Sequence, residues 1–86
     1  MFKLQYHPRA LKFLRKIPAK QAERILKKFE VLQNDIHATQ LNISSLAGTA
    51  NSFRLRVGDI RIVYEISLEL KIIYIQDIDF RGGIYK

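Results

Sequence analysis

Three arginines in the C-terminal half of the chain could bind one anion together. Arg54 and Arg56 precede a Gly58-Asp59 pair, and Arg61 follows it. A two-residue loop at this pair predicts a β-hairpin in which Arg56 faces Arg61 across the two strands. Because side chains alternate across a sheet, all three guanidinium groups would share one face. The planar fork of arginine suits bidentate contact with a phosphate.

The spacing of these arginines allows two interpretations. Like charges directly opposite each other destabilise a strand pair, so a sequence selected only for stability would not place Arg56 against Arg61. The same pattern is compatible with the solvent-exposed face of an antiparallel sheet, where Glu65 offsets part of the charge. The residue pattern alone is therefore compatible with an anion-binding site and with an ordinary solvent-exposed face of the sheet.

Arg81 and Tyr85 could extend the site from the C-terminal end of the chain. If the last strand runs regularly to Arg81, that residue shares a face with positions 73, 75, 77 and 79. A three-residue loop at 68–70 would put these positions on the arginine side. Gly82-Gly83 would then let the chain turn so that Tyr85 approaches the same surface, although Tyr85 could also simply anchor the terminus.

Other kinds of site have weaker support in the sequence. His7 and His37 are the only histidines and lie in different predicted elements, which favours surface or capping roles. Asp77 and Asp79 share a strand but lack the ligand spacing of a metal site. The absence of Cys excludes a thiolate zinc site, a Cys nucleophile and disulfides. We therefore expect neither a metal nor a cofactor.

The elements that would position these arginines form one small domain over residues 1–86. Residues 2–7 alternate as a half-buried strand, and residues 8–17 and 19–32 carry apolar stripes at helical spacing on either side of Pro18. Residues 52–57, 60–67 and 71–78 are rich in β-branched and aromatic residues and predict three strands. Residues 34–51 predict a loop or short turn. The pattern indicates an α+β fold (β-α-α-β-β-β) with a helical hairpin on one face of a mostly antiparallel sheet.

The formal net charge of +7 is concentrated in the helical half. Residues 1–34 hold nine basic and two acidic residues, whereas residues 35–86 hold six of each. Lys27 and Lys28 lie on the exposed side of the second predicted helix and could contact a polyanionic or acidic partner. Since no apolar run is long enough to span a membrane, the sequence predicts a cytoplasmic protein with a polyanionic or acidic partner.

Two segments carry a family resemblance. FRLRVGDIRIVYEI (53–66) and IIYIQDIDFRGGIYK (72–86) resemble the RelE/ParE toxin superfamily of bacterial type II toxin–antitoxin modules, as do the helices PRALKFLRKI and AKQAERILKKFEVLQ. The most specific signature is R-x-R-x-G-D-x-R-x-x-Y, followed by a late Arg and a C-terminal Tyr. The resemblance covers essentially the whole chain and implies the RelE-like fold.

The resemblance implies a function in one of two branches. RelE-like members are ribosome-dependent endoribonucleases that cut mRNA in the A site and inhibit translation. Their metal-free reaction uses the ribose 2′-OH to attack the adjacent phosphate. ParE-like members share the fold but poison DNA gyrase. The C-terminal Tyr favours the nuclease branch, and the remaining alternative is a catalytically weak ribosome- or RNA-binding homologue.

The resemblance also implies roles for individual residues. The positions that surround the scissile phosphate correspond to Arg54, Arg56, Arg61, Arg81 and Tyr85. We expect Arg56, Arg61, Arg81 and Tyr85 to act in catalysis, and Arg54, Arg56, Lys27 and Lys28 to bind RNA.

In two respects the sequence departs from the family pattern. Lysines often occupy the positions of Arg54 and Arg56, and many relatives carry His where Phe80 stands. Arginine stays protonated and is a poor general base.

A toxin of this kind also implies a cognate antitoxin, whose acidic and apolar segment would wrap the toxin in a hetero-oligomer.

Overall fold

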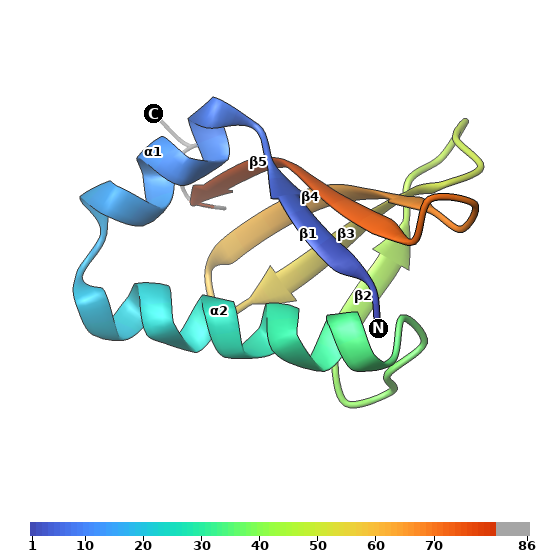
Figure 1. The fold of residues 1–86 in the computed structure, drawn as a ribbon. Helices are drawn as coiled ribbons and strands as arrows, with labels where there is room; N and C mark the ends of the chain where they lie inside the picture. The colour runs from blue at the N-terminus through green and yellow to red at the C-terminus, as the bar shows by residue number, and fades with distance from the viewer. Residues whose placement is uncertain (81–86) are drawn as a thin grey trace.

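The structure is a computed structural model, and it describes residues 1–80 of the chain (Figure 1). Its elements, in chain order, are β1 (Lys3–Tyr6), α1 (Pro8–Lys16), α2 (Ala19–Asn34), β2 (Asn42–Ser45), β3 (Ser52–Val57), β4 (Ile60–Ser67) and β5 (Ile72–Phe80). The strands form one sheet in the order β1-β5-β4-β3-β2. Only the β1–β5 pair is parallel, and the other three pairs are antiparallel. The predicted α+β class is confirmed.

Both helices pack on one face of the sheet, as the apolar stripes predicted. Helix α1 begins at Pro8, and His7 caps it by accepting a hydrogen bond from the Arg9 backbone N–H at 3.1 Å. The helix lies against β5, where the Phe13 and Phe80 rings are 5.1 Å apart. Helix α2 buries Ile25, Phe29 and Leu32 completely. The two helices therefore cover the aliphatic face and leave the opposite face of the sheet without a covering helix in residues 1–80.

The structure adds a strand to the predicted pattern. Within the segment expected to be a loop or short turn, Asn42–Ser45 pairs with β3 as the edge strand β2. The sequence NISS contains one apolar residue, so its period-2 pattern is too short to recognise. Leu41 is nonetheless buried, and Ile43 packs against the core.

The predicted register of the β3–β4 hairpin is confirmed at every pair. Arg56 faces Arg61, and Arg54 faces Val63. At the turn, Gly58 adopts φ +62° while Asp59 keeps a negative φ, as a type II′ turn requires. The Arg24 guanidinium lies 3.5 Å from the point where a Cβ at Gly58 would stand. Glycine therefore serves both the backbone conformation and this close approach.

Strand β5 does not run regularly, which corrects the predicted face of its odd-numbered residues. Its residues pair with β4 at Val63–Asp77 and at Tyr64–Ile75, so Gln76 is an extra residue in a β-bulge. Ile73 and Ile75 are buried among the core residues, whereas Asp77 and Asp79 lie on the arginine side. The β4–β5 turn spans four residues, 68–71, and not the three on which the expectation depended.

Tyr64 is the largest fully buried side chain of the core. It is 0% exposed and stacks on Phe53 with 5.6 Å between the ring centroids. Its hydroxyl makes no hydrogen bond within the described part of the chain. Burial raises the pKa of Tyr64 to about 12, because the charged form would lose its hydration. The ring therefore stabilises the core while its hydroxyl contributes a desolvation cost.

We expect Tyr64→Phe to raise the free energy of unfolding by about 1 kcal/mol, because it removes a buried hydroxyl without a partner. The raised pKa adds a pH dependence. As pH rises above 10, the unfolded chain loses the Tyr64 proton while the folded chain keeps it, so the wild type loses stability between pH 10 and about 12. Urea unfolding at neutral and alkaline pH measures both effects. A Phe variant less stable than the wild type at neutral pH would contradict the expectation.

Candidate anion site on the sheet

The exposed face of the sheet brings the three arginines together. We call Arg54, Arg56 and Arg61 the arginine cluster. Arg54 and Arg56 are exposed, and Arg61 is partly buried between its neighbours on β3 and β5. Cross-strand partners have Cβ atoms about 4.5–5.5 Å apart, so the Arg56 and Arg61 side chains begin within reach of one phosphate group. The register thus produces the concentration of guanidinium groups that the spacing predicted.

Asp79 is the residue of this face that sequence reasoning did not assign to the site. It is the cross-strand partner of Arg61 on the side away from Arg56. One of its carboxylate oxygens accepts a hydrogen bond from the Phe80 backbone N–H at 2.8 Å. An ionised carboxylate can accept a proton, which arginine cannot. The bulge in β5 decides this placement, and no feature of the sequence marks a bulge at Gln76.

One of the two predicted helical lysines reaches the arginine cluster. Lys28 lines a groove of about 150 Å³ together with Arg24 and Arg56, at the edge of the sheet beside the Gly58 turn. Lys27 is exposed elsewhere on α2 and does not line this groove. No local pattern in the sequence singles out Arg24, because the contact between α2 and the turn depends on tertiary packing. Two cations from α2 therefore lie beside Arg56 of β3.

The two histidines have the capping and surface positions that the sequence predicted. His7 is a helix cap, and His37 is exposed, so the two do not form a pair. Within residues 1–80, no three His, Cys, Asp or Glu side chains gather in a way that could hold a metal. Arg81 and Tyr85 lie outside the described residues.

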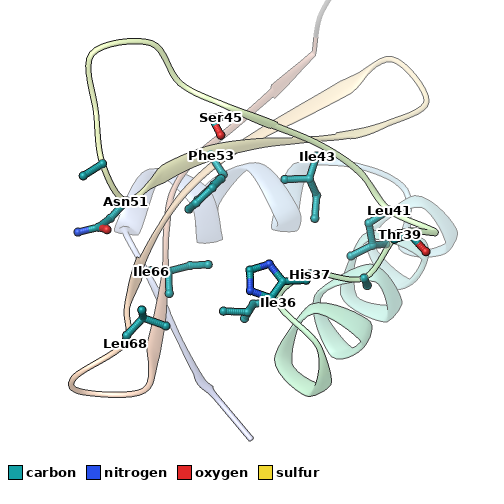
Figure 2. Close-up of a pocket in the computed structure, with 12 residues that line it drawn as sticks. Ile36, His37, Thr39, Leu41, Ile43, Ser45, Asn51, Phe53, Ile66 and Leu68 are labelled. Carbon is teal, nitrogen blue, oxygen red and sulfur yellow. The ribbon is translucent and has the colours of Figure 1, made fainter.

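The opposite side of the sheet carries an apolar groove of about 440 Å³. Figure 2 shows Ile43, Phe53 and Ile66 pointing into it from the strands, with Ile36 and His37 on the other wall. Leu68, which is 63% exposed, forms part of the rim. The groove contains one titratable side chain, His37, so its lining suits apolar side chains better than phosphate chemistry.

Comparison with known proteins assigns this chain to a family. The model of the family described as "ParE toxin of type II toxin-antitoxin system, parDE" matches residues 4–85. The chain belongs to this toxin family. It is therefore a RelE-like toxin of a type II toxin–antitoxin system, and the predicted superfamily is confirmed.

Individual relatives agree with the family assignment. The protein named "Putative toxin RelE1" of Methanocaldococcus jannaschii is 31% identical over 86 residues, which cover 99% of this chain and 96% of that protein. The RelE–RelB complex of Pyrococcus horikoshii has a chain with a TM-score of 0.83 and 25% identity, covering 94% of this chain and 96% of that one. The RelB–RelE antitoxin–toxin complex of Methanococcus jannaschii gives a TM-score of 0.76 at 27% identity, with 94% of each chain covered.

One further finding bears on the setting of this toxin. Neither helix described in residues 1–80 is long and apolar enough to cross a membrane.

Repulsion between Arg56 and Arg61 should lower the free energy of unfolding of the wild type. We expect Arg56→Thr to raise the free energy of unfolding by about 0.5 kcal/mol, and by more at low salt, because it removes the charge opposite Arg61. Arg54→Thr is the matched control, since Arg54 faces the uncharged Val63 and Ser44. Equal effects of the two substitutions in denaturant titrations would contradict direct cross-strand repulsion.

Proposed function

We propose that this toxin is an endoribonuclease that cuts mRNA in the ribosomal A site and thereby inhibits translation. The observation that carries the proposal is the pairing of Arg56 with Arg61 on the exposed sheet face, next to the carboxylate-bearing Asp79. Placing two arginines opposite each other costs stability, which is understandable if an anion normally lies between them. The family membership supports the same conclusion.

The proposed reaction needs charge stabilisation and two proton transfers. The 2′-oxygen attacks the adjacent phosphorus, the bond from phosphorus to the 5′-oxygen breaks, and the products are a 2′,3′-cyclic phosphate and a 5′-hydroxyl. Arg56 and Arg61 would hold the non-bridging oxygens as negative charge develops on them. The 2′-hydroxyl must lose a proton and the leaving 5′-oxygen must gain one. On the described face, Asp79 would accept the first proton, and solvent water would supply the proton that the leaving 5′-oxygen gains. Arg54 would bind a neighbouring phosphate.

Arg81 and Tyr85 complete the proposal from outside the described residues. Arg81 would add a second contact to the scissile phosphate, and Tyr85 would orient the 2′-hydroxyl or stack on a base. The positive groove of Arg24, Lys28 and Arg56 would hold ribosomal RNA or the mRNA backbone. Lys27 would contribute only general electrostatic attraction, because it lies away from that groove.

A codon-positioned cut is the decisive test of the nuclease. Primer extension on an mRNA translated in vitro with the purified toxin should show strong stops within A-site codons. Arg61→Ala should reduce the rate by at least about a hundredfold, because it removes the guanidinium between Arg56 and Asp79. Glu65→Gln, on the same strand face, is the control and should cut like the wild type. Undiminished cleavage by the Arg61→Ala variant would contradict the proposed site.

The family model favours one alternative, since its description names ParE toxins. As a gyrase poison, the purified toxin would block DNA supercoiling with ribosomes absent and would leave translated mRNA intact. A binding-only homologue would associate with ribosomes in a salt-dependent manner without cutting mRNA or inhibiting gyrase. The same purified protein in the two assays separates the three functions.

We further propose that the toxin is held by a cognate antitoxin, as the RelE chains in the complexes of relatives are held by RelB. A net charge of +7 favours an acidic partner. The apolar groove beside the free edge of β2 has the volume and lining to accept apolar side chains of such a segment. The two sides of the sheet would then serve the antitoxin and the RNA respectively.

Leu68 and Leu70 offer a matched test of antitoxin binding. Both lie in the β4–β5 turn, and they are 63% and 66% exposed, but only Leu68 lines the groove. Leu68→Glu should weaken binding of the co-expressed antitoxin at least about tenfold, because the burial of one leucine contributes roughly 1.5–3 kcal/mol. Leu70→Glu should leave the affinity unchanged. Equal affinities of the two variants by calorimetry would show that the antitoxin binds elsewhere.

A further inference from the structure

A second hollow lies on the same sheet face as the arginine cluster. It measures about 360 Å³ and is lined by His7, Arg9, Val63, Tyr74, Gln76 and Asp77. This volume is at the lower end of the range of about 300–1,000 Å³ that small-molecule sites occupy. The residues come from the start of α1 and from β4 and β5, which are far apart in the sequence. The proposed phosphate chemistry does not use any of them.

The bulge in β5 creates this hollow. Tyr74 and Asp77 are three residues apart, so in a regular strand they would lie on opposite faces. The extra residue, Gln76, changes the alternation, and Ile75 and Ile78 can both remain in the core. Tyr74 and Asp77 consequently share the exposed face. Bulges often re-aim side chains beside functional sites.

The wall on the α1 side is held by contacts between His7 and Arg9. The Nδ1 atom of His7 accepts hydrogen bonds from the Arg9 backbone N–H at 3.1 Å and from Arg9 Nε at 3.2 Å. Strand β5 fixes His7 in turn, because the His7 N–H donates to the Ile75 carbonyl at 2.8 Å. The Arg9 side chain is thereby held against His7 where both line the hollow with Tyr74.

The chemistry of the lining suits a nucleobase. An aromatic ring and a guanidinium plane can stack on a base, and a carboxylate and an amide can bond to its edge. Val63 lies two residues from Arg61 on β4, and Asp77 lies two residues from Asp79 on β5. Two residues of strand span about 6.6 Å, a distance that one nucleotide bridges from phosphate to base.

We propose that this hollow binds the base of the nucleotide whose phosphate lies on the arginine cluster. The inference rests on the proposed RNA-cleaving function and adds a site of base selection to it. The Asp77 carboxylate accepts hydrogen bonds, so it favours guanine, adenine and cytosine, which offer exocyclic amino donors, over uracil, whose edge offers only the ring N3–H. Tyr74 supplies stacking energy for any base.

Binding of mononucleotides tests the hollow without any cleavage assay. The ¹⁵N-labelled full chain is titrated with GMP, AMP, CMP and UMP, and with ribose 5-phosphate as a ligand without a base. We expect all five to shift amide resonances around Arg56 and Arg61. Only the nucleotides should shift those of Tyr74, Gln76 and Asp77, with UMP binding several-fold more weakly than the others. Pocket resonances that do not move, or that move equally with ribose 5-phosphate, would overturn the proposal.

Variants separate stacking from edge recognition. Tyr74→Ala should weaken GMP binding by about tenfold, and Tyr74→Phe should retain it, because the ring stacks without its hydroxyl. Asp77→Asn should abolish the discrimination against UMP. Glu65→Gln, which removes a carboxylate from the position across from Tyr74 but outside the hollow, should bind all four nucleotides like the wild type. Unchanged nucleotide affinities in Tyr74→Ala and Asp77→Asn would count against the site.

Cleavage then connects the hollow to the reaction. On mRNAs that differ only in the base next to the cut, the wild-type toxin should discriminate against uracil, and Asp77→Asn should lose this preference while still cutting. If the wild type does not cut mRNA at all, the proposed function fails and the mononucleotide titration alone decides the site. If the wild type cuts and Asp77→Asn keeps the same base preference, the base-binding hollow fails and the nuclease stands.

Discussion

The register of the β3–β4 hairpin is the constraint on which the rest of this toxin depends. Once Gly58 and Asp59 form a two-residue turn, alternation sends Leu55 and Ile62 to one face and Arg56 and Arg61 to the other. A slip of one residue would bury guanidinium groups and expose the aliphatic core, at a cost far above the stability of a small domain. The hydrophobic effect that folds the sheet therefore also holds the arginines on its exposed face.

The two faces of the sheet have different physical roles. The helix-covered face stabilises the protein through aliphatic packing around Tyr64, Phe29 and the strand residues. The exposed face combines opposed arginines, a neighbouring carboxylate and a polar hollow, and the like charges of Arg56 and Arg61 cost stability. This division explains how a domain of 86 residues can tolerate like charges across a strand pair: the core that compensates for them lies on the other side of the same strands.

The bulge at Gln76 has a comparable influence on the last strand. It lets Ile75 and Ile78 remain buried while Asp77 and Asp79 reach the arginine side, so one inserted residue gives the site both of its nearby carboxylates. The parallel pairing of β1 with β5 then carries His7 and Arg9 to the bulge. Residues from both ends of the described chain meet on this face for that reason.

Much of the fold and part of the site follow from local rules. The helices at Pro8 and Pro18, the hairpin turn and the shared face of Arg54, Arg56 and Arg61 were predictable because each depends on periodicity or turn chemistry over a few residues. The edge strand at 42–45 was not, since a run of four residues with one apolar side chain has no readable period.

Only the tertiary structure decided which residues surround the arginine cluster. Arg24 and Lys28 meet Arg56 because α2 packs beside the hairpin turn, and Lys27, one residue away, points elsewhere. Asp79 lies next to Arg61 because β5 contains a bulge. The bulge allows both Ile75 and Ile78 to be buried in the core. The amino-acid sequence by itself determined which residue types could bind a phosphate. Long-range packing determined which of them meet, because these contacts join segments whose separation along the chain no local pattern records.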